Sequence, residues 1–324
     1  MKSEETIFPS VAIIIINWNS YDLTADCLRS LRACNYSNYD IIISDNCSSD
    51  DSAERLKTDF PEIVLLNNND NLGFTGGNNE GIKLALKKDY KYLLLLNNDT
   101  LVEPDFLTNL IQIIDADTSI AAVQPKIYFE YDRELVWSAG GKYYPALTLS
   151  KAIGEGVKDS GQFNQTLESD WLTGCAFLAR TSVIREVGLL SDLYFYGCFD
   201  DVDWSIRMRK KGYKLYFCSE SKIYHAVAAS SKGEQTHSEG VLKPFFHYLV
   251  NRNHILFLRQ HTSWFYLPTS YLYQLYKLLG YSAYFIYKRR FRKLKAFLHG
   301  FWHGLSKPLN PKALNHKDYI KLYK

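Results

Sequence analysis

The chain has 324 residues, of which 46% are hydrophobic and 23% charged, with a formal net charge of +3. This composition is that of an ordinary globular protein of about two domains, or of one large α/β domain with an appendage. The small net charge gives no support for binding to nucleic acid. Six cysteines without a CxxC pair or zinc-ligand spacing indicate reduced thiols. The polar start, MKSEETIFPS, lacks the basic region of a secretion signal, and we expect a cytoplasmic location.

Strands, polar loops and helices alternate through the first hundred residues. Apolar, largely β-branched or leucine-rich runs predict strands, buried on both faces of a parallel sheet, at 11–16, 39–44, 63–67 and 92–96. Helices are expected from Ser20 to about Arg32, after Gly81, and over 102–117. Further strands are expected at 121–128, before Arg180 and at 213–218, and residues 129–170 read as a flexible hairpin or insertion that covers the site. The pattern predicts an α/β fold with a doubly wound, mostly parallel central sheet flanked by helices.

The loops after the first four predicted strands each carry an Asn or Asp. These residues are Asn17, Asp45, Asn71 and Asp99. In doubly wound sheets, ligands bind outside the carboxyl ends of the strands. Turn chemistry explains one such residue but hardly four at one edge. The sequence therefore predicts a nucleotide-type site there, to which we also assign Asn97 and Asn98.

A glycine-rich segment, NLGFTGGNNEG, spans residues 71–81. It is neither a Walker A loop nor GxGxxG, because no Lys-Ser/Thr pair follows Gly77. Gly73, Gly76 and Gly77 would let the backbone approach a bound donor closely. The alternative is a glycine-rich helix entry that only turns the chain.

Three carboxylates, Asp200, Asp201 and Asp203, crowd four positions between an aromatic run and a basic one. Adjacent acids repel one another and are rarely buried unpaired. One interpretation is a first helical turn, where acids favour the helix dipole. The other is a catalytic site.

Taken in order, these segments resemble the family 2 glycosyltransferases with the GT-A fold, most closely their rhamnosyltransferase-like and galactofuranosyltransferase-like branch. The resemblance covers roughly residues 10–260. It rests on IIIINWNS (13–20), SDNCSSDDS (44–52), NLGFTGGNNEG (71–81), LLLLNNDT (93–100), WLTGCAFLAR (171–180), FDDVDWSIRMRKKGY (199–213), His225 and FHYLVNRNHILF (246–257). It implies a GT-A catalytic domain over 1–260, with a nucleotide-sugar half at about 10–128 and an acceptor half at about 129–260.

The resemblance also implies roles for single residues. Asp201 matches the general base of the family, and Asp200 and Asp203 would support it. Asp99 matches the last acid of the metal-binding DxD and His225 a metal-ligating histidine, so the expected cofactor is Mn²⁺ or Mg²⁺. Asn97 stands where the first Asp of that motif often is, which leaves one carboxylate fewer, although an amide oxygen also suits these hard cations.

The remaining site residues are expected to contact the donor or the acceptor. Asp45 matches an Asp that binds the nucleobase or ribose of the donor. The loop that contains Trp171, Thr173 and Gly174 is expected to contact the acceptor or the donor sugar. Trp171 would stack on a sugar face. The other predicted donor-binding residues are Asn17, Asn71, Gly73, Gly76, Gly77, Asn97 and Asn98.

The implied activity is an inverting, metal-dependent hexosyl transfer from a nucleotide sugar, with dTDP-rhamnose as the first expectation, to a hydroxyl of a lipid-linked cell-surface glycan such as O-antigen, capsule or exopolysaccharide. One general base suffices for direct displacement with inversion. Two alternatives remain open. A nucleotidyltransferase would normally need a basic residue after the first strand, and 17–21 has none. A catalytically weak nucleotide-sugar-binding protein would agree with Asn97.

Residues 261–324 form a C-terminal aromatic and basic helical region. Residues 264–287 are apolar and contain seven tyrosines, and KRRFRKLK follows at 288–295. Tyrosine favours membrane interfaces over the hydrocarbon centre, although ~20 residues would suffice for a span. We therefore expect residues 264–298 to dock on an anionic membrane, peripherally at the inner face of the cell membrane. The alternative is packing on the catalytic domain or in a homodimer.

Overall fold

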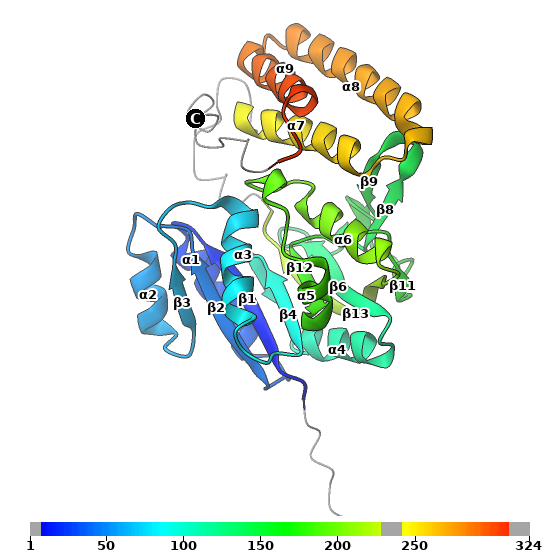
Figure 1. The fold of residues 1–324 in the computed structure, drawn as a ribbon. Helices are drawn as coiled ribbons and strands as arrows, with labels where there is room; N and C mark the ends of the chain where they lie inside the picture. Colours follow the sequence, from blue (N-terminus) through cyan, green and yellow to red (C-terminus); the bar gives the residue numbers. More distant parts are fainter. Residues whose placement is uncertain (1–7, 228–241, 311–324) are drawn as a thin grey trace, which may run out of the picture.

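The computed structural model describes residues 8–227 and 242–310. Residues 1–7, part of the start used to predict the location, and residues 311–324, the end of the predicted C-terminal helical region, lie outside these ranges. An 11-stranded sheet forms the middle of the molecule. Helices cover its two faces, and three C-terminal helices lie beyond the end of the sheet at which β1 finishes (Figure 1).

The N-terminal half of the sheet is parallel, as predicted. Its strands β1 (Val11–Asn17), β2 (Tyr39–Asp45), β3 (Val64–Asn67) and β4 (Tyr92–Leu96) lie in the order β3-β2-β1-β4. Alternate residues of β1 belong to two different cores, Ile13 and Ile15 to one and Ala12 and Ile14 to the other. This double burial explains the continuous apolar run. The helices of this half are α1 (Tyr21–Arg32), α2 (Ser52–Asp59), α3 (Gly73–Ala85) and α4 (Phe106–Ala116).

The second half of the sheet is mixed. Strand β12 (Ala176–Arg180) is antiparallel to both β4 and β6 (Ile120–Phe129). Strand β13 (Lys214–His225) is parallel to β6 and antiparallel to β5 (Thr100–Val102), with His225 opposite Thr100. This register carries the end of β13 to the residues that follow β4. The helices of this half are α5 (Thr181–Val187) and α6 (Asp200–Lys210).

Residues 129–170, predicted as a hairpin or insertion, form a set of short strands. A hairpin of β8 (Gly141–Tyr144) and β9 (Leu149–Ala152) is indeed present and forms a separate sheet. The others, β7 (Leu135–Ser138), β10 (Val157–Lys158) and β11 (Leu167–Glu168), extend the main sheet.

The prediction for the glycine-rich segment was wrong, because residues 73–81 are already helical in α3 rather than a loop before it. A Cβ atom on Gly81 would lie 2.5 Å from Cγ2 of Ile14 in β1, and one on Gly77 would lie 2.8 Å from Oδ1 of Asn46. These glycines therefore allow α3 to pack closely on the sheet and on the loop after β2. The alternative interpretation, a glycine-rich helix entry, is closer to what is observed.

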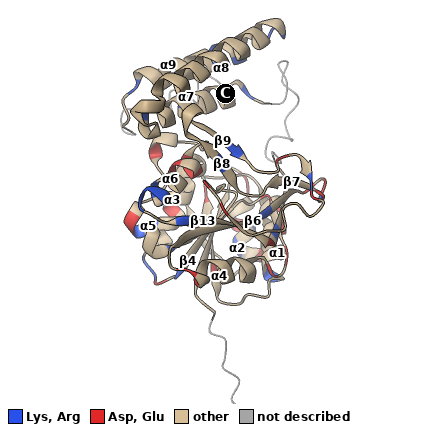
Figure 2. Cartoon of the chain, turned by 90° about the vertical axis from the view of Figure 1, so that its right-hand side faces the viewer, with Lys and Arg blue, Asp and Glu red and all other residues tan. Residues whose placement is uncertain are grey.

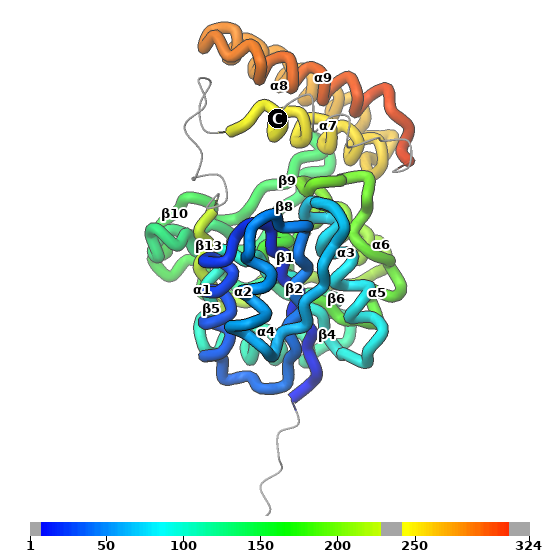
Figure 3. Tube along the Cα trace, turned by 90° about the vertical axis from the view of Figure 1, so that its left-hand side faces the viewer, coloured from blue at the N-terminus to red at the C-terminus, as the bar shows by residue number. Residues whose placement is uncertain are grey.

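The C-terminal helices are α7 (Pro244–His261), α8 (Leu267–Tyr287) and α9 (Phe291–Ser306), with a short 3₁₀ turn, η4 (Trp264–Tyr266), before α8. Figures 1, 2 and 3 show α7 between the main sheet with its covering helices and the pair α8–α9. Glycines bring α9 against α7: a Cβ on Gly300 would lie 2.4 Å from the carbonyl oxygen of Tyr248. Within the described ranges, no helix combines the length and the apolar character needed to cross a bilayer.

We predict that Gly300→Ala lowers the free energy of unfolding by about 1–3 kcal/mol, because the added methyl group meets a backbone atom that cannot rotate away. Gly280→Ala is the matched control. It lies in α8 with no atom within 4 Å of its Cβ, and alanine in place of an exposed helical glycine stabilises by up to about 1 kcal/mol. Chemical denaturation measures both, and equal stability of the two variants would contradict the α7–α9 contact.

Candidate active site

A cleft of about 380 Å³ opens at the carboxyl ends of β1 and β4 and at the start of α3. Six of the predicted site residues line it: Asn71, Gly73, Asn97, Asn98, Asp99 and His225. They come from the loop after β3, the start of α3, the loop after β4 and the end of β13. Lining residues that the sequence analysis did not single out include Trp18, Asn46, Phe74, Asn78 and Tyr196.

Three polar side chains converge at the inner corner of the cleft. Nε2 of His225 lies 3.1 Å from Oδ1 of Asp99 and 3.3 Å from the side-chain amide of Asn97. The main chain supports this corner, because the N–H of Ala226 donates to the carbonyl of Asp99. The amide nitrogen of Asn97 faces the imidazole. With this amide rotated so that its oxygen faces inward, the carboxylate, the imidazole and the amide oxygen would form a donor set of the kind that Mn²⁺ or Mg²⁺ accepts. In the described part of the chain, no three His, Cys, Asp or Glu side chains lie close enough together to hold a metal ion. A metal site with three protein ligands would therefore need Asn97 in addition to Asp99 and His225.

The proton and a cation would compete for His225. Burial by itself lowers the pKa of this imidazole, but Cys175 and Asp99 beside it raise the pKa to about 10. Its Nδ1 atom is buried and has no hydrogen-bond partner among the described residues. The ring of Trp137 packs edge-on against the imidazole at 4.7 Å between centroids and fixes its plane.

Asn17 and Asp45 do not line the cleft. Both are buried, and they face each other across the β1–β2 register. The amide of Asn17 donates to Asp45 at 2.8 Å, and Asp45 also accepts from the N–H and the hydroxyl of Ser48. Their hydrogen bonds lie within the chain, so in this structure they shape the loops beneath the cleft.

Gly76 and Gly77 also lie outside the cleft lining. Both are in the first turns of α3, where their missing side chains leave room for Leu72 and Asn46. The amide of Asn46 donates to the carbonyl of Gly73 at 2.9 Å and ties the loop after β2 to the start of that helix.

The three acids of α6 have three different environments. Asp201 is partly exposed, and its oxygens accept from the N–H groups of Gly174, at 3.1 Å, and Val202, at 2.8 Å. Burial raises its pKa above the ordinary value of a carboxyl group, against the effect of these hydrogen bonds. Asp200 is buried beside it and accepts from Thr75, and burial together with the charge of Asp201 holds its pKa well above the usual range.

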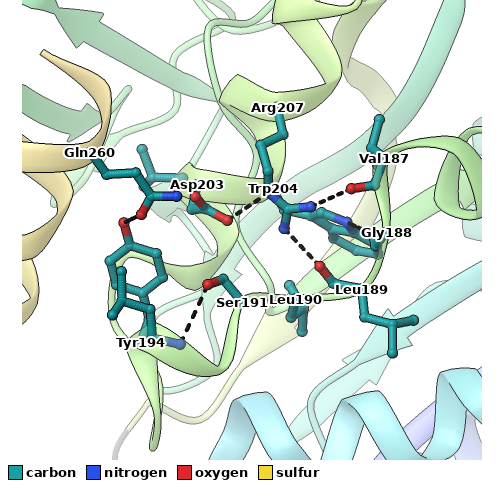
Figure 4. A network of polar contacts seen from close by, with 12 residues as sticks. Val187, Gly188, Leu189, Leu190, Ser191, Tyr194, Asp203, Trp204, Arg207 and Gln260 are labelled. Carbon is teal, nitrogen blue, oxygen red and sulfur yellow. Dashed lines mark hydrogen bonds and ion pairs between the residues drawn. The ribbon is translucent and has the colours of Figure 1, made fainter. Parts of the chain in front are cut away.

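Asp203 is fully buried and paired (Figure 4). One oxygen accepts from Nε of Arg207 at 2.8 Å, and the other lies 2.7 Å from Nε2 of His261 in α7. Arg207 in turn donates to the carbonyls of Val187 and Leu189. The pair of Asp203 with Arg207 lies within α6, and the contact of Asp203 with His261 joins α6 to the C-terminal helices.

The loop before α6 is strained. Residues 196–199 all have φ between 71° and 108°, and only Gly197 among them lacks a side chain. Such conformations cost free energy and persist only where the surroundings hold them. The amide of Asn253 in α7 holds them here, since it donates to the carbonyls of Gly197, at 2.9 Å, and Cys198, at 3.0 Å. Nε of Arg252 fixes that amide by donating to its oxygen.

A second cleft, of about 270 Å³, is lined by Trp171 and Thr173 together with Trp137, Ser138, Ser150 and others. The indole of Trp171 lies against Gly141, and its N–H donates to the carbonyl of Lys142. Trp137 borders this cleft and also touches His225 of the first one. Gly174 packs on Phe74 and donates to Asp201, so it lies between the acid and the first cleft.

Sequence reasoning missed the supporting residues Asn253 and His261. The signal was available only in part, because Asn253 lies within the segment FHYLVNRNHILF that carried the resemblance, and His261 follows it. Neither residue has a pattern that predicts which loop or helix it meets.

The chain is similar in sequence to known glycosyltransferases. The family profile described as Glycosyl transferase family 2 matches residues 12–188, more than half of the chain. The low-salt glycan biosynthesis hexosyltransferase Agl10 of Haloferax volcanii is 23% identical over 225 residues, 69% of either chain. The poly-beta-1,6-N-acetyl-D-glucosamine synthase of Staphylococcus aureus is 28% identical over 115 residues, which are 35% of this chain and 27% of the synthase.

Solved structures show the same fold at low identity. GalNAc-T7 with UDP, GalNAc and Mn²⁺ has a TM-score of 0.60 at 16% identity, over 77% of this chain and 48% of GalNAc-T7. The mannosyltransferase PcManGT of Pyrobaculum calidifontis with GDP-Man and Mn²⁺ has a TM-score of 0.52 at 13% identity, over 92% and 87%. TarS 1-349 of S. aureus with UDP-GlcNAc has a TM-score of 0.57 at 15% identity, over 90% and 81%. These likenesses support the expected GT-A architecture.

We predict that Asn253→Ala speeds amide hydrogen exchange in residues 196–199 by on the order of tenfold or more, since two hydrogen bonds worth about 1 kcal/mol each are lost. Asn251→Ala is the matched control: it lies on the same helix and is equally buried, but its amide donates to Phe297 in α9. If both variants change the exchange of the loop equally, Asn253 has no specific role there.

Proposed function

The chain belongs to glycosyl transferase family 2 and is a glycosyltransferase, and we propose that it transfers a hexose from a nucleotide sugar to a hydroxyl group of a lipid-linked cell-surface glycan. The observation that carries this proposal is the pair of adjoining clefts. The first has the acid, imidazole and amide corner at its base, and the second is bordered by two tryptophans. Agl10, by its name, acts in glycan biosynthesis as a hexosyltransferase.

The first cleft is proposed to hold the donor. Asp99, His225 and Asn97 would hold Mn²⁺ or Mg²⁺, which supplies positive charge for a leaving diphosphate when it is bound. Polar side chains of Asn71 and Asn98 line the cleft and are proposed to contact the donor. Asn17 and Asp45 are proposed to act on the donor through the loops that they hold. Our first expectation for the donor remains dTDP-rhamnose.

Asp201 is proposed to be the general base. An acceptor hydroxyl has a high pKa, so a carboxylate must take its proton while the bond to the anomeric carbon forms. The N–H groups of Gly174 and Val202 fix the orientation of this carboxylate. Its raised pKa makes it a better proton acceptor than an ordinary aspartate. A single carboxylate base, without a second carboxylate as nucleophile, suffices for the proposed direct displacement with inversion.

The second cleft is proposed to bind the acceptor. Trp171 and Trp137 offer aromatic surface of the kind on which sugar rings stack, and Thr173 adds a hydroxyl. The two remaining acids act indirectly: Asp200 lies behind the base, and Asp203 anchors α6. We further propose that residues 1–260 act as the catalytic domain and residues 261–324 as a C-terminal helical region that contacts a membrane or a second copy of the chain.

We predict that Asp201→Asn lowers turnover by about 10²- to 10⁴-fold, because the amide cannot accept the proton. Donor binding, measured by isothermal titration calorimetry, should stay unchanged. Turnover is followed with dTDP-rhamnose and a panel of UDP- and GDP-sugars. Asp26→Asn, an exposed acid that forms an ion pair with Arg29, is the control and should behave as the wild type. Unchanged turnover in Asp201→Asn would overturn the assignment of the base.

We predict that His225→Ala weakens Mn²⁺ binding by at least about tenfold, as loss of a ligand does even when others remain. Asn97→Asp should strengthen Mn²⁺ binding, because a second carboxylate replaces the neutral amide. Electron paramagnetic resonance titration of free Mn²⁺ measures both without any turnover. Unaltered Mn²⁺ affinity in both variants would place the metal elsewhere.

A further inference from the structure

We propose that the outer face of α8 and α9, together with η4, docks on the surface of an anionic phospholipid bilayer without crossing it. We name this surface the outer helical face; its exposed apolar members include Trp264, Leu272, Tyr276, Leu279, Tyr287 and Trp302. The docking itself needs no assumption about the reaction.

Exposed apolar side chains are concentrated on this face. Fourteen of the 24 exposed large hydrophobic side chains among the described residues fall within residues 264–302. Trp264 is 81% and Tyr287 80% exposed. Along α8, Leu272, Tyr276 and Leu279 follow helical spacing and form one continuous stripe. Contiguous exposed patches of this kind mark interaction surfaces, whereas single exposed apolar residues need no explanation.

The charge of this region has a single sign. Between residues 240 and 317 the sequence has no Asp or Glu but 13 Lys and Arg. The rest of the chain therefore has 25 basic and 35 acidic residues, and its net charge is negative. In Figure 2, the ribbons of α7, α8 and α9 carry blue segments but no red ones. An anionic surface would attract this end of the molecule and repel the other. The protein would therefore dock with α8 and α9 toward the surface.

The basic groups stand where a lipid headgroup would meet them. Lys288, Arg289, Arg292 and Lys295 are exposed at the turn from α8 to α9, beside the exposed rings of Tyr287 and Phe291. Lys and Arg close to an interface gain from anionic lipids, and tyrosine and tryptophan prefer the boundary between headgroups and hydrocarbon. The face thus combines the two chemical features of a peripheral membrane contact.

A second copy of the chain fits this face less well. Two copies that met through it would bring their basic turns together, and like charges at an interface oppose association. A spanning arrangement is equally disfavoured, because no helix in the described ranges is apolar enough over sufficient length. An anionic bilayer surface is the occupant that matches both the charge and the rings.

The position of the face agrees with the proposed acceptor. The pair α8–α9 lies beyond α7, on the side of the sheet at which the strands deliver residues to the first cleft (Figure 1). Docking there would bring the cleft toward the bilayer, where a lipid-linked glycan would be found. The encounter of the cleft with a lipid-linked glycan rests on the proposed function, whereas the docking does not.

The test is co-sedimentation of the full-length protein with vesicles. We expect it to pellet with vesicles of phosphatidylcholine and phosphatidylglycerol, to stay in solution with phosphatidylcholine alone, and to be released by high salt. A charge variant carries Lys288→Gln, Arg289→Gln, Arg292→Gln and Lys295→Gln, and should lose at least tenfold in the partition coefficient. An apolar variant with Tyr276→Ser, Tyr287→Ser and Trp302→Ser should lose a similar factor.

The matched control removes four other exposed positive charges, with Arg55→Gln, Lys83→Gln, Lys158→Gln and Lys211→Gln, and should pellet as the wild type. Circular dichroism checks that all variants fold, and light scattering reports their oligomeric state. The proposal is overturned if the charge variant pellets as well as the control. It is also overturned if the wild type is a dimer and the apolar variant alone is a monomer. Donor hydrolysis in solution should be unchanged in the charge variant, so failure of the proposed reaction and failure of docking give different results.

Discussion

The pairing of one fully buried carboxylate, Asp203, connects the parts of this protein. An isolated charge in the interior is costly, and removing one partner of a buried pair typically costs about 3–5 kcal/mol. Asp203 therefore requires both Arg207, which is also bonded to the carbonyls that end α5, and His261 of α7. This requirement fixes α6 against the C-terminal helices. Since α6 begins with Asp200 and Asp201, it also fixes the proposed base.

The C-terminal helices are consequently part of the support of the active site. Asn253 of α7 bonds to the loop of residues 196–199, whose residues have left-handed conformations. That loop carries Tyr196 into the first cleft and leads directly into α6. The same α7 packs on α9 through Gly300 and Gly304. A contact of α8 and α9 with a membrane would thus act one helix away from the residues that hold the base.

The two clefts owe their adjacency to the mixed half of the sheet. Strand β13 pairs with β5 so that His225 arrives opposite Thr100, beside Asp99. Trp137, after β6 in the chain, packs on the imidazole and borders the second cleft. If the two clefts hold donor and acceptor as proposed, this shared aromatic wall suits a reaction in which a hydroxyl must meet an anomeric carbon at short range.

The sequence by itself determined the parallel strands, because burial on both faces leaves continuous apolar runs such as 11–16. It also determined that Asp99, Asn97 and Asn98 lie at the edge of the sheet where the cleft opens, because the strand ends of a doubly wound sheet meet at one edge. It could not decide that residues 73–81 are helical, since glycine permits both a loop and close helix packing, and only Ile14 and Asn46 in space distinguish them. Nor could it separate Asp200, Asp201 and Asp203. Their partners Thr75, Gly174 and His261 lie between 27 and 125 residues away in the chain. Only the tertiary structure brings those partners together and gives each acid a different task.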